Sequence, residues 1–135
     1  MKKLSRDEIM QILPHRDAML LLDEAWEGGG AYTVKGDEFF LQGHFPDNPI
    51  VPGVILCEIM VQSVCATLHG QTEGKTLYFT GIDGVRIRNK VVPGDVFTTE
   101  VSLKIQKGPF YFINAKGFVG GKLCISGVLS FCCAD

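Results

Sequence analysis

Two kinds of hydrophobic pattern divide the chain. Between residues 54 and 68, apolar side chains occupy nearly every position and leave no polar stripe. This pattern predicts a helix that is buried on all sides and closes at Gly70. From residue 76 onward, alternating runs separated by Gly and Pro turns predict antiparallel strands. An apolar helix among many strands is expected to be wrapped by a curved sheet.

The N-terminal third predicts smaller elements. Ser5 and Glu8 have the spacing of a capping box, which indicates a short helix that ends before Pro14. The apolar run 19–22 and the segment 31–40 are predicted to be two strands joined by a turn. The later predicted strands are Thr76–Ile82, Val85–Val92, Val96–Gln106, Phe110–Val119 and Lys122–Phe131.

Composition predicts an ordinary globular protein. The chain has 135 residues, of which 46% are hydrophobic and 21% charged, so a single domain over residues 1–135 is expected. A net charge of −2 indicates neither a nucleic-acid nor a membrane partner. Residues 1–10 are too polar for a secretory leader, and segment 54–68 is shorter than a membrane span.

The cysteines indicate a reducing compartment. Their number is odd and their spacing does not match a metal-binding pattern, so we expect free thiols in a cytoplasmic protein without a metal or other cofactor. Two are on the predicted central helix and act as small apolar side chains, and the adjacent pair near the C-terminus is expected in a strand. The cysteines are Cys57, Cys65, Cys124, Cys132 and Cys133.

Two residues carry candidate acid–base chemistry. Glu58 lies in the second turn of the predicted buried helix, and no Lys or Arg occurs between Phe39 and Gly74. An unpaired buried carboxyl group is expected to hold its proton near neutral pH, as a general acid must. His44 lies in the preceding Pro/Gly-rich loop and is the side chain best suited to act as a base near pH 7.

Three motifs cover nearly the whole chain and carry a family resemblance. They are LPHR…LLLD at 13–23, GHFP…NPIVPGV…E…Q at 43–62 and YFTGID…VVPGD at 78–95. In this order and spacing, they resemble the β-hydroxyacyl-[acyl-carrier-protein] dehydratases of type II fatty-acid synthesis. The resemblance implies an α+β hot-dog fold, in which a curved antiparallel sheet wraps around a long central helix.

The resemblance also implies a reaction and a catalytic pair. In it, a (3R)-3-hydroxyacyl thioester loses water to give a trans-2-enoyl thioester during fatty-acid elongation. His44 corresponds to the catalytic histidine and Glu58 to the catalytic acid. A glutamate at this position is similar to the dehydratase-only branch, whereas the dehydratase/isomerase branch characteristically has aspartate. Isomerase activity stays open, because only Glu58 opposes it.

Four further positions are implied to bind substrate. The backbone N–H groups of Gly53 and Val54 are expected to stabilise the enolate oxygen at the start of the helix. Gln62 lies one turn after Glu58, where its amide either orients the acid or is simply a buried polar group. Tyr78 corresponds to a tyrosine that lines or gates the acyl tunnel, although core packing is the commoner role for a tyrosine.

The resemblance implies an acidic acyl carrier protein and a second subunit as partners. Arg86, Arg88 and Lys90 alternate along one predicted strand, so they form either part of the carrier-docking surface or a solvated face. In the family, His44 of one subunit and Glu58 of another form each site. A homodimer, or a hexamer as a trimer of dimers, is therefore expected.

Several alternatives remain open from the residues alone. His44 by itself is compatible with a loop histidine that caps backbone groups, and Glu58 with a satisfied core carboxylate. His15 and Arg16 are expected to brace the fold or a subunit contact. The rival functions are a hot-dog acyl thioesterase and a non-catalytic acyl-thioester-binding protein, but the retention of both His44 and Glu58 favours elimination.

Overall fold

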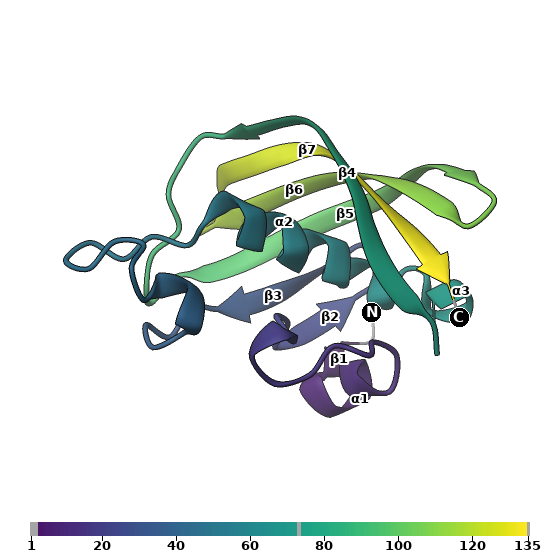
Figure 1. Ribbon diagram of the computed structural model, residues 1–135, viewed down its shortest axis with the longest axis horizontal. Coiled ribbons are helices and arrows are strands. Elements are labelled where there is room, and N and C mark those ends of the chain that lie inside the picture. The colour runs from purple at the N-terminus through teal and green to yellow at the C-terminus, as the bar shows by residue number, and fades with distance from the viewer. Residues whose placement is uncertain (1–2, 73, 135) are drawn as a thin grey trace.

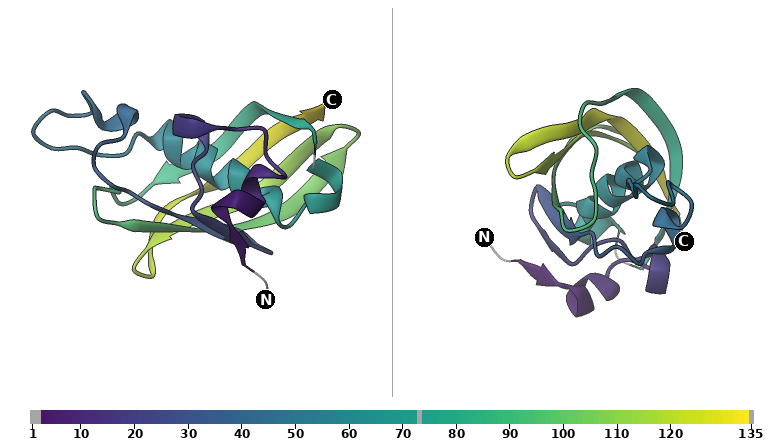
Figure 2. Two further views of the ribbon diagram at one scale, coloured as in Figure 1. Left: turned by 90° about the horizontal axis from the view of Figure 1, so that it is seen from below. Right: turned by 90° about the vertical axis from the view of Figure 1, so that its left-hand side faces the viewer.

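A single curled sheet surrounds the central helix of this protein. The computed structural model describes residues 3–72 and 74–134. Its seven strands are all paired antiparallel in the order β1-β2-β3-β5-β6-β7-β4. Helix α2 (Gly53–Gln62) lies on the concave side, and the end-on view shows the strands curving around it (Figures 1 and 2). The predicted architecture of a curved antiparallel sheet around a helix is confirmed.

The N-terminal elements are short and the C-terminal strands are long. The short helix predicted from the capping box is present, with Ser5 accepting from the Glu8 amide and Glu8 accepting from the Ser5 amide. The other elements are β1 (Leu4–Ser5), α1 (Arg6–Met10), β2 (Glu24–Trp26), β3 (Gly29–Thr33), α3 (His69–Thr72), β4 (Thr76–Ile87), β5 (Val96–Lys107), β6 (Phe110–Val119) and β7 (Lys122–Ala134).

The predicted strand over residues 19–22 is wrong. Asp17–Met19 forms a 3₁₀ turn, and the three leucines after it are buried in an irregular segment. This run is apolar because it packs into the core, while its backbone is bound by the side chain of Gln62 rather than by a neighbouring strand. The predicted strand 31–40 is also too long, because β3 ends at Thr33 and Phe39–Leu41 forms another 3₁₀ turn.

The central helix is shorter than predicted. Helix α2 ends at Gln62, a 3₁₀ turn follows over Ser63–Cys65, and Gly70 lies inside the separate helix α3 instead of capping α2. The Ser63 hydroxyl donates to the Ile59 carbonyl, which bends helices, and it accepts from the buried Thr99 hydroxyl of β5. No helix in the described part of the chain is long and apolar enough to cross a membrane.

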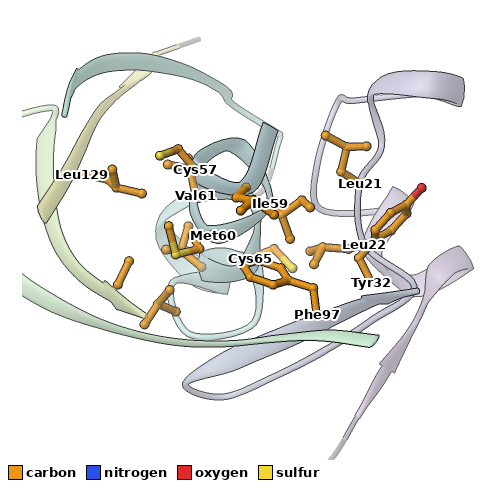
Figure 3. Packing of buried hydrophobic residues seen from close by; sticks show 14 of the residues in the cluster. Leu21, Leu22, Tyr32, Cys57, Ile59, Met60, Val61, Cys65, Phe97 and Leu129 are labelled. Carbon is orange, nitrogen blue, oxygen red and sulfur yellow. The ribbon is translucent and has the colours of Figure 1, made fainter. Parts of the chain in front are cut away.

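Burial of the helix is also less uniform than its sequence predicts. The middle of α2 is enclosed, and Figure 3 shows Ile59, Met60 and Val61 lying between the sheet and the N-terminal loop. At its first turn, however, Val54 is 67% exposed, and Glu58 is partly exposed. The start of α2 therefore opens toward the solvent, on the same helix face as Glu58.

The two strands predicted over 76–92 form one strand, β4, at the edge of the sheet. Its pairing with β7 shifts register twice, and Gly84 adopts a φ of +60° within the second irregularity, so the chain bulges where a turn was expected. Of the proposed docking residues, Arg86 is in β4, whereas Arg88 and Lys90 follow its end; all three are exposed. The prediction of a single strand face for them is wrong.

The remaining strand predictions hold. The observed β5 and β6 match the predicted ranges to within a residue, and β7 extends three residues beyond its prediction. The five cysteines are free thiols, and the adjacent pair Cys132 and Cys133 lies in β7 as predicted. Cys57 and Cys65 are buried in the core, where Figure 3 shows them among apolar side chains.

Candidate active site

His44 is held in the loop before α2 with one ring nitrogen available for chemistry. Its Nδ1 lies 2.8 Å from the carbonyl oxygen of Ile50, and its ring stacks on Phe45. A carbonyl oxygen only accepts hydrogen bonds, so Nδ1 carries the proton and Nε2 of the neutral ring carries a lone pair. This arrangement prepares Nε2 to remove a proton from a bound molecule.

The imidazole borders a cavity at the start of α2. This cavity has a volume of about 400 Å³, and the residues lining it are His44, Pro52, Gly53, Val54, Cys57, Ile82, Val85 and Ile87. A Cβ on Gly53 would come within 2.5 Å of the Ile87 Cδ1 atom, so glycine allows close approach of the β4 end to the helix. The cavity wall is largely apolar, as an acyl chain requires.

Backbone donors also face this end of the helix. Pro52 occupies the N-cap position and provides no side-chain cap. The N–H groups of Gly53 and Val54 belong to the first helical turn, where they have no acceptor within the helix. Together with the helix dipole, they can bind an oxygen that develops negative charge.

Glu58 is oriented by Gln62 one turn later on α2. The Gln62 Nε2 atom donates to Glu58 Oε2 at 2.9 Å and to the Met19 carbonyl at 2.9 Å, and its Oε1 accepts from the Leu21 amide at 2.8 Å. Gln62 is completely buried, and these three contacts determine which way its amide points. One carboxyl oxygen of Glu58, Oε2, is thereby held by a hydrogen bond from the same helix.

Replacing Gln62 with leucine is expected to destabilise the fold by about 2–4 kcal/mol. The change leaves the buried Leu21 amide without a partner, which costs roughly 1–3 kcal/mol, and it removes the hydrogen bond to the part-buried Met19 carbonyl, which is worth about 1 kcal/mol. Urea unfolding measures this difference. The matched control is Gln71→Leu at an exposed position on α3, which should change stability by less than about 0.5 kcal/mol. Equal effects of the two changes would contradict this account of Gln62.

His15 is a residue of the site that the sequence analysis assigned only to bracing. Its Nε2 lies 3.5 Å from Glu58 Oε2, on the same carboxylate oxygen that Gln62 contacts. Burial lowers the pKa of His15, and Arg16 lowers it further, while Glu58 raises it. The imidazole is therefore neutral at pH 7. The PHR motif in the sequence marked His15 as a residue of interest. Because His15 and Glu58 are far apart in the sequence, however, nothing there indicated that they are in contact.

The predicted site residues do not all line one cavity. Glu58 is not among the residues lining the cavity at His44, nor among those of a second cavity of about 300 Å³ that His44 borders beside Arg88 and Lys90. Tyr78 is 56% exposed on the edge strand β4 and borders neither cavity. Within one chain, Glu58 and Tyr78 thus lie outside the walls of both cavities that His44 borders.

The described residues contain no group of three or more His, Cys, Asp or Glu side chains placed to hold a metal ion. The acid–base groups identified at the site are the imidazoles of His44 and His15 and the carboxyl group of Glu58. In combination with the free N–H groups at the start of α2, these groups suit proton transfer next to a carbonyl.

Known proteins resemble this chain over nearly its full length. It is 40% identical over 137 aligned residues to the 3-hydroxyacyl-[acyl-carrier-protein] dehydratase FabZ of Staphylococcus aureus strain JH9, an alignment covering 96% of this chain and 94% of that protein. The FabZ protein of S. aureus strain Newman matches at the same identity and coverage.

Solved structures share the fold. The dehydratase heterocomplex ApeI:P from Xenorhabdus doucetiae superposes with a TM-score of 0.76 at 20% identity, covering 94% of this chain and 91% of that one. The fluoroacetyl-CoA thioesterase FlK superposes with a TM-score of 0.65 at 14% identity, covering 79% and 86%. The FabA-like domain family matches residues 13–127. By this match and by its 40% identity to the FabZ dehydratases, the chain belongs to the FabA-like family.

Proposed function

We propose that this protein is a 3-hydroxyacyl-[acyl-carrier-protein] dehydratase of fatty-acid elongation, which converts a (3R)-3-hydroxyacyl thioester into the trans-2-enoyl thioester. The observation that carries the proposal is the 40% identity to FabZ dehydratases over 96% of the chain. The orientation of His44 supports it, because Nδ1 is committed to Ile50 and Nε2 is left as a base.

The residues divide the elimination into three tasks. The Nε2 atom of His44 removes the proton from the carbon next to the thioester carbonyl. The N–H groups of Gly53 and Val54 stabilise the negative charge that moves onto the carbonyl oxygen. The carboxylic acid of Glu58 protonates the 3-hydroxyl group, which leaves as water while the C–O bond breaks. His44 gains one proton and Glu58 loses one, so a proton transfer through solvent restores the starting state.

The absence of Glu58 from the walls of both cavities that His44 borders supports a site built from two subunits. The edge strand β4 is 12 residues long and carries Tyr78, Ile82 and Ile87, each more than half exposed. A long apolar edge is a template for pairing with another strand. A second copy along this edge would cover these side chains and bring its own residues to the open first turn of α2. The proposed assembly is this homodimer, alone or repeated three times in a hexamer.

The function is tested by assaying hydration and dehydration over a series of acyl chain lengths. The proposal expects interconversion of 3-hydroxyacyl and trans-2-enoyl thioesters without release of free thiol. A saturated acyl thioester is the control substrate. Free thiol from both substrates, with no enoyl product, would indicate a thioesterase and contradict the proposal. A cis-3-enoyl product would add isomerase activity, which the glutamate at position 58 opposes.

Acyl carrier proteins are acidic, and this chain presents three exposed cations on one stretch: Arg86 in β4, and Arg88 and Lys90, which line the second cavity that His44 borders. Reversing the charge of Arg86 and Arg88 to glutamate is expected to raise KM for the carrier-bound substrate about tenfold, because electrostatic steering is lost. The KM of a small thioester surrogate should stay unchanged. Lys104→Glu and Lys107→Glu on β5 provide a control of equal charge change, because neither lysine lines a cavity that His44 borders. Equal effects on both substrates would contradict docking at this surface.

The proposed function also concerns the compartment in which the protein works and its need for a cofactor. All five cysteines are free thiols, which supports a reducing cytoplasm. The three tasks above are carried by side chains and backbone amides of the protein, so we propose that the enzyme acts without a metal or an organic cofactor.

A further inference from the structure

Two side-chain nitrogen atoms lie close to one carboxyl oxygen of Glu58. Its Oε2 accepts from Gln62 Nε2 at 2.9 Å and lies 3.5 Å from His15 Nε2. The Gln62 side chain accepts from the Leu21 amide and donates one of its two N–H groups to the Met19 carbonyl. Its other N–H group is therefore directed at Glu58 Oε2. Oε2 therefore acts as an acceptor, and the acidic proton of Glu58 belongs on the other oxygen, Oε1.

The position of His15 is determined by its own loop. The Arg16 guanidinium donates to the carbonyls of Met10, Leu13 and His15 at 2.7–2.8 Å and ties the loop to the end of α1. Asp17 then turns the chain with a φ of +53°. The side chain of His15 is only 16% exposed, so it is enclosed against α2 rather than extended into solvent. A loop held at this many points presents one ring orientation to Glu58.

The tautomer of His15 follows from the surroundings of its two nitrogens. Nδ1 is buried and has no hydrogen-bond partner among the described residues. A proton on Nδ1 would bury an unmatched N–H group and turn the Nε2 lone pair toward an acceptor oxygen, and both are unfavourable. A proton on Nε2 leaves only a lone pair unmatched and directs the N–H group at Glu58 Oε2. In this tautomer, the neutral ring presents its N–H group to the carboxyl oxygen, 3.5 Å from the ring nitrogen.

We propose that His15 is a positioning residue for the acid: with Gln62, it binds Glu58 Oε2, directs Oε1 toward the substrate hydroxyl and stabilises the carboxylate formed when the proton leaves. This inference rests on the proposed dehydratase function. It assigns to His15 a task separate from that of His44, which acts on the substrate itself. Each donor on Oε2 makes the acid stronger, because it favours the form that remains after proton transfer.

The kinetic test compares His15→Phe with His15→Gln. Phenylalanine keeps the ring volume and removes the donor, whereas the Nε2 amide of glutamine can replace the histidine Nε2–H. His15→Phe should lower kcat roughly tenfold, the size of one hydrogen bond to a charged group, with little change in KM. His15→Gln should recover most of this loss. Thermal melts of both variants establish that the proteins compared are folded.

The pH profile of kcat distinguishes a positioning role of His15 from a role in packing alone. Without the donor, the carboxylate formed on proton transfer is less stabilised, so the basic limb of kcat should move to higher pH in His15→Phe and return in His15→Gln. The nearby titratable and charged groups are Cys57 on α2 and Arg16 on the loop. Burial and Glu58 raise the pKa of Cys57 to about 11, so its thiol stays neutral over the profile. Equal losses of kcat in both variants with an unmoved limb would overturn the proposal.

A measurement without turnover tests the contact directly. NMR shifts of the two ring nitrogens show which of them carries the proton in the neutral His15 ring of the wild-type protein. The inference expects the proton on Nε2, directed at Glu58, because Nδ1 is buried without a partner among the described residues. A proton on Nδ1 would overturn the inference. A wild-type protein without dehydratase activity would overturn the proposed function, whereas an active wild type with a fully active His15→Phe would overturn this inference alone.

Discussion

Replacing His44 with alanine should lower kcat/KM for dehydration by about 10²–10⁴-fold, the range for losing one general acid–base group. The Nε2 atom of His44 is the base that the structure leaves unengaged, since Nδ1 is bound to the Ile50 carbonyl. The proton next to a thioester carbonyl is weakly acidic, and solvent cannot replace a positioned base at neutral pH. Steady-state kinetics with a 3-hydroxyacyl carrier-bound substrate measure the loss.

The control for this change is His69→Ala, at an exposed histidine on α3 that lines neither cavity bordered by His44. It should keep nearly full activity. The fold of His44→Ala is expected to survive, because the ring is only partly buried and loses one hydrogen bond, worth about 1 kcal/mol. An active His44→Ala protein would exclude the proposed mechanism, whatever the other residues contribute.

Replacing Glu58 with glutamine should cause a loss of the same order, about 10²–10⁴-fold in kcat. Glutamine has nearly the same shape but cannot give a proton to the leaving hydroxyl group, and hydroxide is a poor leaving group. Its side-chain oxygen can still accept from Gln62, so the packing of the site is preserved. A melting temperature close to that of the wild type would show that the loss is chemical.

Mixing the two inactive proteins tests the shared site. If His44 and Glu58 come from different subunits, a mixed dimer of His44→Ala and Glu58→Gln contains one intact and one doubly altered site. Random mixing at equal amounts should then restore roughly one quarter of wild-type activity, because half of the dimers are mixed and each has one of two sites intact. The unmixed proteins, treated identically, are the controls. If mixed dimers form without any recovery, the site is contained in one chain.

Local patterns predicted those parts of the structure that depend on neighbours in sequence. The capping box at Ser5 and Glu8, the turn between β6 and β7, and the alternating strands after residue 96 involve contacts within a few residues or across a short turn. Hydrophobic periodicity reports such structure directly. Two predictions that failed involve a distant partner. Thr99 of β5 donates to the Ser63 hydroxyl just after α2 ends, and the side chain of Gln62 takes the place of a strand partner for Leu21.

The sequence by itself determined the class of fold, and it pointed to a histidine and a glutamate as the reactive side chains, because residue types and short spacings carry that information. Only the tertiary structure decided which nitrogen of His44 is free, that β4 is one exposed edge strand, and that His15 contacts Glu58. These facts depend on contacts that form only when the chain is folded. Hydrogen bonds act over about 3 Å, so they are settled by folding and not by position along the chain.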